Sequence, residues 1–259
     1  MFLSAAFGAE LEETTGEPEN TPKPWAINLS LYMWFPGMNG SFANGRHSAS
    51  VDYSFLDIAG KLRNFPAAFM GRLEANYERL GFYLDGNYMQ MDFRPRFDGG
   101  ISKGLSTELG IMDYGAMYRL FGPTRSERMQ RWTEKSKSNI LDVYLGGRTL
   151  WLSNQIQLRG LPSPAMSQTL TAPVLGGRII VELSPEWFVL MDGNAGGFGA
   201  DDVSFTGALM GLVGYRTTLF DQPASIEAGF KALRVDVSKP GFETNATMSG
   251  PFLGMSHFW

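Results

Sequence analysis

Polar and apolar residues alternate with a period of two along most of this 259-residue chain, from Trp25 to its last residue. In residues 26–34 apolar side chains hold every second position, and Asn28, Ser30 and Tyr32 lie between them. A period of two predicts β-strands with one apolar and one polar face. Similar alternation occurs in residues 69–77, 82–88, 141–151, 175–182, 205–216 and 226–231.

Charged residues of both signs lie in the middle of these strands, on the polar face. Arg72 shares a face with Glu74, and Asp142 shares one with Arg148. The apolar faces carry aromatic residues near their ends, such as Trp151. A transmembrane barrel turns apolar side chains to lipid and polar ones to the lumen, with aromatics at both interfaces. Lipid offers no backbone partners, so the sheet must close. The fold class predicted is all-β, a closed antiparallel transmembrane β-barrel.

The strand count depends on residues 37–52. Asn44-Gly45 is a strong hairpin signal, and strands on both sides of it would give about 12 strands, with 10 as the fallback. Tight turns are predicted near 78–81, 184–186 and 221–224, and longer connections near 94–104, 154–170, 196–203 and 238–248. Residues 54–63 have helical spacing and predict a short helix in the lumen or at the mouth. The basic segment 122–138 is interpreted as a solvated loop.

Composition excludes several classes of function. The chain has no Cys and only two histidines, His47 and His257, so neither a Cys-ligated nor a His-rich metal centre is expected, and no cofactor. Residues 196–204 match one copy of a calcium-binding nonapeptide, but the motif works in stacked repeats, so a Gly-rich outer loop is the preferred interpretation and no metal is predicted. Its net charge of −4, without a basic run, argues against nucleic acid as a partner. Residues 1–24 are interpreted as the remnant of a signal peptide and a disordered acidic, Pro-rich lead-in, with a purely disordered tail as the alternative. Residues 25–259 form the barrel.

The C-terminal segment GPFLGMSHFW, residues 250–259, ends in an aromatic residue after alternating apolar positions. It resembles the assembly signal of bacterial outer-membrane proteins, carried here by Leu253, Met255, His257 and Trp259. Residues 174–189, 194–205, 212–216, 227–233 and 250–254 also resemble a family of uncharacterised, porin-like proteobacterial outer-membrane proteins, with a weaker match at 50–62. The resemblance implies a barrel in the Gram-negative outer membrane. Asn194 and Lys231 depart from the family's usual Asp and Arg, which leaves any shared lumen chemistry in doubt.

The candidate site is the charged face of the lumen. It comprises Arg72, Glu74, Asp85, Asp113, Asp142, Arg148, Arg178, Glu182, Arg216, Glu227 and Lys231. These residues would line a narrow passive diffusion channel for small solutes, which is the leading hypothesis. The rival is a structural or adhesive barrel whose opposite charges pair and plug the lumen, because a barrel this small need not leave an aqueous path.

A weaker alternative is an outer-membrane lipid hydrolase using His47 with Ser48 or Ser50. No third catalytic partner and no GxSxG motif support it, so no enzyme activity is predicted. The expected partners are outer-membrane lipid or lipopolysaccharide and, during insertion, the barrel-assembly machinery.

Overall fold

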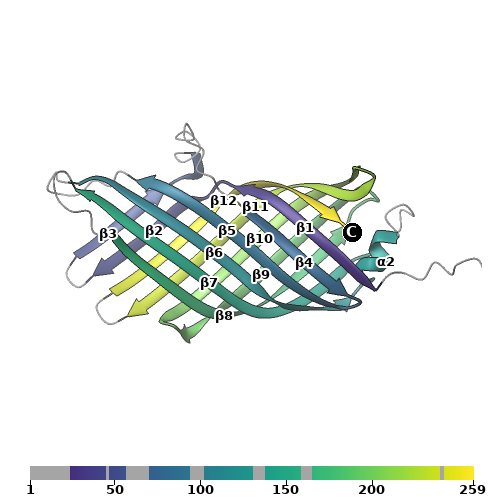
Figure 1. Cartoon of the computed structure of the whole chain (residues 1–259), viewed down its shortest axis with the longest axis horizontal. Helices are drawn as coiled ribbons and strands as arrows, with labels where there is room; N and C mark the ends of the chain where they lie inside the picture. Colours follow the sequence, from purple (N-terminus) through teal and green to yellow (C-terminus); the bar gives the residue numbers. More distant parts are fainter. Residues whose placement is uncertain are drawn as a thin grey trace, which may run out of the picture.

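The chain closes into one antiparallel barrel (Figure 1). The computed structural model describes residues 24–44, 47–56, 70–93, 102–130, 138–158, 165–239 and 242–259. The elements are β1 (Trp25–Trp34), β2 (Gly37–Asn44), β3 (His47–Tyr53), β4 (Met70–Tyr77), β5 (Leu80–Phe93), β6 (Ser102–Phe121), α2 (Arg125–Gln130), β7 (Ile140–Leu158), β8 (Ala165–Glu182), β9 (Trp187–Ala200), β10 (Val203–Leu219), β11 (Gln222–Lys239) and β12 (Phe242–Phe258).

Ten strands form the closed ring, and two more extend it. β4 to β12 pair in chain order, and β1 joins β4 on one side to β12 on the other. β2 pairs with the first half of β12, and β3 pairs with β2. The two strands around the predicted Asn44-Gly45 hairpin are therefore present. β2 and β3 extend the sheet beyond the ring and do not add to the number of strands around it. The predicted total of about 12 strands therefore counts all strands, and the fallback of 10 counts the closed ring.

β1 and β2 act as one long strand with a short interruption. β12 pairs with β1 at Phe252 and with β2 at Ser249, and the Phe35 N–H donates to the Pro251 carbonyl between them, at 3.0 Å. Pro36 lacks an N–H and cannot donate to the ladder, which explains the break at this point. The β2–β3 hairpin thus projects from the barrel wall beside β12 (Figure 1).

The short turns lie at one end of the barrel, where β1 also begins and β12 ends. Short turns are usual at the periplasmic end of such barrels, so we assign this end to the periplasm. The turn after β4 is tight, as are those after β8 and β10, at the predicted places. At the opposite, outer end the prediction was wrong for residues 196–203, which lie almost entirely in β9 and β10. Only Asp201 and Asp202 separate the two strands, both with positive φ.

The strands are longer than a membrane crossing requires. β6, β7 and β8 contain 20, 19 and 18 residues, whereas about 9–11 residues span the hydrocarbon core. The sheet therefore continues beyond the outer membrane surface, through most of the segments where the sequence predicted loops near 154–170 and 238–248. The residues between these strands, 159–164 and 240–241, lie outside the described part of the chain.

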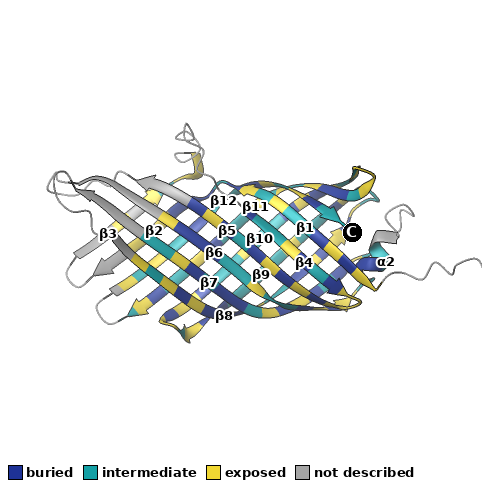
Figure 2. Cartoon of the chain, viewed as in Figure 1, coloured by how far each residue is buried: buried dark blue, intermediate teal, exposed yellow. Residues whose placement is uncertain are grey.

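The outward face is apolar and carries two aromatic bands. Where the structure describes the side chains, exposed and buried residues alternate along most of the strands (Figure 2). Near the periplasmic end, Trp25 packs edge-on against Tyr77 with ring centroids 5.0 Å apart, and Trp187 lies 5.0 Å from Tyr215. Trp151 belongs to the outer band and is also exposed. These bands place the two membrane interfaces.

Glycines on the inner wall accept aromatic rings from neighbouring strands. At Gly214 an added Cβ would lie 2.1 Å from the Phe188 ring, whereas at Gly211 on the same strand it would meet nothing within 4 Å. We expect Gly214→Ala to lower the free energy of unfolding by about 1–3 kcal/mol, because the added methyl group would overlap the Phe188 ring, which also contacts Arg128 and Arg216. Urea unfolding in lipid vesicles measures this. Equal midpoints for Gly214→Ala and the control Gly211→Ala would contradict it.

The helix predicted at residues 54–63 is present at its start, because Phe55 and Leu56 are helical, and residues 57–63 lie outside the described residues. A second short helix, α2, lies in the segment that was interpreted as a solvated loop, so that interpretation was wrong for residues 125–130. Within the described residues, no helix is long and apolar enough to cross a membrane.

Candidate functional site

A buried carboxylate joins three arginines from three different elements inside the periplasmic half of the barrel. The Glu74 side chain on β4 has no exposed surface. It accepts from Arg72 Nε at 2.6 Å and from Arg178 Nη1 on β8 at 2.6 Å, and it contacts Arg125 Nη2 on α2. Because β4 and β8 are separated in the ring by three strands, this contact crosses the lumen.

Two further carboxylates complete this layer. Asp142 on β7 accepts from Arg119 Nε at 2.7 Å and from Arg178 Nη2 at 2.8 Å. Glu182 on β8 contacts Arg216 and lies 3.4 Å from Arg128. Arg178 therefore links the Glu74 and Asp142 groups into one continuous network. We call these residues, Arg72, Glu74, Arg119, Arg125, Arg128, Asp142, Arg178, Glu182 and Arg216, the ionic plug.

Helix α2 reaches into this plug from the periplasmic end. It begins with a capping box, in which the Glu127 N–H donates to Thr124 Oγ1 at 3.2 Å and the Thr124 N–H to Glu127 Oε2 at 2.7 Å. The helix leaves the β6 end and contacts β1. Burial lowers the pKa of Arg125 to about 10 and that of Arg128 to about 9, so both remain cations at neutral pH.

A second polar group lies farther toward the outer end. Arg148 is 1% exposed. It holds Asp113 with two bonds of 2.7 Å and donates to Thr206 at 2.9 Å and to Asn194 at 3.1 Å. This fork matches a carboxylate with two parallel bonds, the strongest geometry for such a pair. The group ties β6, β7, β9 and β10 together across the lumen.

The remaining predicted lumen residues lie beside β1. Asp85 accepts from the Tyr32 hydroxyl at 2.6 Å and lies 3.5 Å from Arg72. Lys231 Nζ donates to the Tyr32 hydroxyl at 3.1 Å and to Asn87 Oδ1 at 3.3 Å. Glu227 accepts from Ser225 at 2.7 Å.

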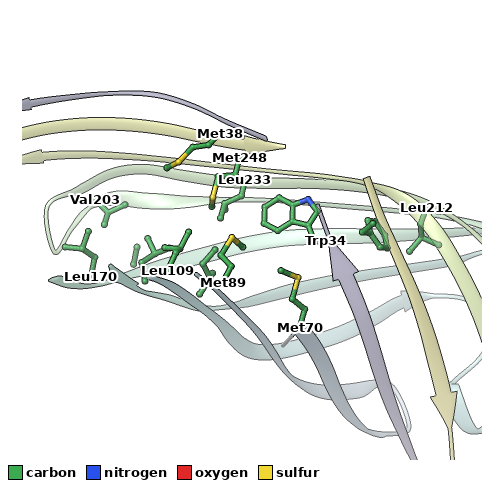
Figure 3. Close-up of a cluster of buried hydrophobic side chains, with 14 of the residues drawn as sticks. Trp34, Met38, Met70, Met89, Leu109, Leu170, Val203, Leu212, Leu233 and Met248 are labelled. Carbon is green, nitrogen blue, oxygen red and sulfur yellow. The ribbon is translucent and has the colours of Figure 1, made fainter. Parts of the chain in front are cut away.

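Apolar side chains line much of the inner wall as well, mainly toward the outer end, which the alternating pattern did not predict. Trp34, Met70, Leu109 and Leu150 belong to one buried hydrophobic cluster contributed by strands all around the barrel (Figure 3). The lumen was expected to be polar throughout, as it is in an aqueous channel. A signal existed, because β6 has apolar residues on both faces around Ile111. A segment of this kind predicts a strand with apolar side chains on both the lipid face and the lumen face.

Each of the predicted residues has a side-chain partner in the structure, and Arg72, Glu74, Asp85, Asp142 and Arg178 are joined in one network. Other inward residues, which the sequence pattern did not single out, belong to the same interior. Arg119 could have been found, because it shares the face of Asp113 at a spacing of six residues. Asp192 lies on β9 and accepts from the Tyr144 hydroxyl at 2.6 Å. Arg125 and Arg128 had no strand periodicity that could place them inside.

The proposed assembly signal lies where the barrel closes. The Trp259 and Ile27 backbones exchange two hydrogen bonds of 2.9 Å. Leu253, Met255 and Trp259 are exposed on the lipid side, and the His257 ring stacks edge-on against Trp259 at 4.2 Å.

The residues considered for hydrolysis lie on β3. His47 pairs with Asn44 in the ladder, and Ser50 pairs with Ser41. The side chains of His47 and Ser48 are outside those that the structure describes. Among the described residues, no three histidine or acidic side chains gather as metal ligands.

Comparison with known proteins supports the fold. No protein-family model and no curated protein matches the sequence. The outer-membrane protease OmpT from Escherichia coli matches in structure with a TM-score of 0.52 and 10% identity, over 92% of this chain and 98% of that one. Ail of Yersinia pestis matches with a TM-score of 0.37 and 10% identity, over 92% and 100%. At these identities the likeness shows the fold alone.

The closed antiparallel barrel and the match to OmpT define the class. The chain is a bacterial outer-membrane β-barrel, and it is located in the outer membrane. The neighbours differ in role, so the class carries no specific activity with it.

Proposed function

We propose that this protein is a non-conducting outer-membrane barrel with a plugged lumen, which serves as a rigid scaffold for its outer strands. The observation that carries the proposal is the Glu74 carboxylate, buried between arginines of β4, β8 and α2. An ion crossing the lumen would have to part these pairs, and breaking a buried ion pair is strongly unfavourable. Toward the outer end the inner wall is lined by apolar side chains, which disfavour the passage of ions.

The scaffold role follows from the length of the strands. β6 to β8 and β10 to β12 extend the sheet beyond the outer surface, and the continuous pairing of these strands keeps this extension rigid. A rigid cylinder that ends in loops outside the cell is suited to adhesion or to a structural role. A narrow channel remains the competing function and is decided by the same experiment.

The test is single-channel recording of the refolded protein in planar bilayers. We expect silence, with heat-modifiable gel migration proving that the barrel has folded. Arg148→Ala and Arg178→Ala are recorded in parallel, because each removes a side chain that crosses the lumen. Steady conductance of the unmodified protein, with an ion selectivity that shifts in these two variants, would overturn the proposal and make the protein a channel lined by those arginines.

A further inference from the structure

Part of the inner wall borders a hollow. Lys231, Met210 and Leu190 face inward, yet each keeps part of its surface exposed. Their chain neighbours Phe230 and Met191 point to the lipid and are exposed on that side. Because lipid does not reach the inner face, the exposed part of these inward side chains must border space inside the barrel. Met210 pairs directly with Lys231 in the ladder, so cation and apolar surface lie side by side.

Lys231 has room for an anion at this hollow. Among the described residues its Nζ donates to the neutral oxygens of Tyr32 and Asn87, and an ammonium group can donate three hydrogen bonds. No carboxylate of these residues lies within ion-pair distance of Nζ. The Tyr32 hydroxyl links Nζ to Asp85, whose carboxylate also lies beside Arg72, so Asp85 is shared between the two cations. In this respect Lys231 differs from the arginines of the ionic plug, which all contact carboxylates.

The surface next to Lys231 suits a hydrocarbon chain. Nζ lies 5.3 Å from the centre of the Trp34 ring. Trp34 belongs to the apolar cluster together with Met38, Met70, Met89 and Met248, which lie around it in Figure 3. Methionine side chains are unbranched and polarisable, and they repack easily around an apolar guest. Closer to the outer mouth, the wall continues with the part-exposed Leu152 and Val235.

We propose that the lumen above the ionic plug binds a fatty acid, with its carboxylate on Lys231 and its chain along Trp34 and the methionines. A bare inorganic anion would leave the apolar wall unused, and a neutral hydrocarbon would leave the lysine unused. The outer mouth admits the ligand, since the ionic plug closes the periplasmic side. The direction of entry rests on the proposed plug, whereas the contacts of the bound ligand do not.

The experiment uses the full chain in phosphatidylcholine nanodiscs and 5-doxyl stearate, a fatty acid with a quenching nitroxide near its carboxylate. Trp34 is the buried tryptophan of the described barrel, whereas Trp25, Trp151, Trp187 and Trp259 are exposed to lipid. The difference in quenching between the unmodified protein and Trp34→Phe therefore measures the probe in the lumen, separately from probe dissolved in the membrane. Lys231→Met removes the charge, Lys231→Arg keeps it, and Ala246→Trp fills the wall of the cluster near the mouth.

We expect saturable quenching of Trp34 in the unmodified protein and in Lys231→Arg. In Lys231→Met the half-quenching concentration should rise by about tenfold or more, because a charge-assisted hydrogen bond is lost. Ala246→Trp should abolish the saturable part. The methyl ester of the probe should behave with the unmodified protein as the acid does with Lys231→Met. No saturable quenching of Trp34, or quenching that is the same in Lys231→Met, would overturn the proposal in variants whose folding is shown by heat-modifiable migration.

Discussion

Glu74→Gln is expected to lower the free energy of unfolding by about 3–5 kcal/mol, the largest effect of any single substitution considered for this barrel. Glutamine has the shape of glutamate but no charge, and its amide nitrogen is a donor placed among donors. Arg72, Arg125 and Arg178 would then share a buried space without the carboxylate that now binds all three. Removing one partner of a buried ion pair leaves uncompensated charge in a medium of low dielectric constant.

The matched control for this substitution is Asp236→Asn, another exchange of an acid for its amide. Asp236 pairs with Arg234 at 3.0 Å, but the arginine side chain is 55% exposed. Exposed pairs contribute about 0–1 kcal/mol, so the control should hardly change stability. Urea unfolding in vesicles, followed by tryptophan fluorescence, compares the two variants. Similar losses in both would mean that the Glu74 network does not stabilise the barrel.

Arg148→Met is expected to cost about 3 kcal/mol alone, and much less when Asp113→Asn is already present. The single change leaves the Asp113 carboxylate without the bidentate partner that holds it at 2.7 Å. Once the carboxylate is neutral, no buried charge is left behind. Neutralising both members of a buried pair is often well tolerated, whereas neutralising one is not.

A double-mutant cycle measures this coupling from the urea unfolding of the unmodified protein, the two single variants and the double variant. We expect a coupling energy of about 2 kcal/mol or more, since the two side chains are in direct contact. Additive losses would show that Arg148 stabilises the barrel through Thr206 and Asn194 and not through its charge.

The function of this barrel depends on the side chains inside the lumen more than on those that face the lipid. The ionic plug crosses the periplasmic half of the lumen, and apolar side chains line much of the inner wall toward the outer end. The hollow beside Lys231 borders Trp34 of this apolar wall, which makes it a place for a bound molecule. The channel recordings and the fatty-acid experiment test these two features separately, and either can fail without the other.

The sequence by itself determined the wall of this barrel. A period of two assigns each side chain to a face, and lipid accepts only apolar side chains, so residues such as Leu73 and Leu175 had one possible direction. The same period placed Glu74, Asp142 and Arg178 together on the inner face. The sequence also predicted the short connections near Glu78 and Asp221. In the structure both residues lie in these turns and adopt positive φ.

Only the tertiary structure decided what fills the barrel. Glu74 and Arg178 are 104 residues apart, and the period of two says which face they share but not which strand lies opposite. The break at Phe35–Pro36 turned an expected ring of twelve into a ring of ten with two extensions. Helix α2 lies against the lumen because Arg125 and Arg128 form ion pairs with Glu74 on β4 and Glu182 on β8. These contacts form only when the ring closes. Closure depends on the pairing of all ten ring strands, and the residue pattern of a single strand cannot predict it.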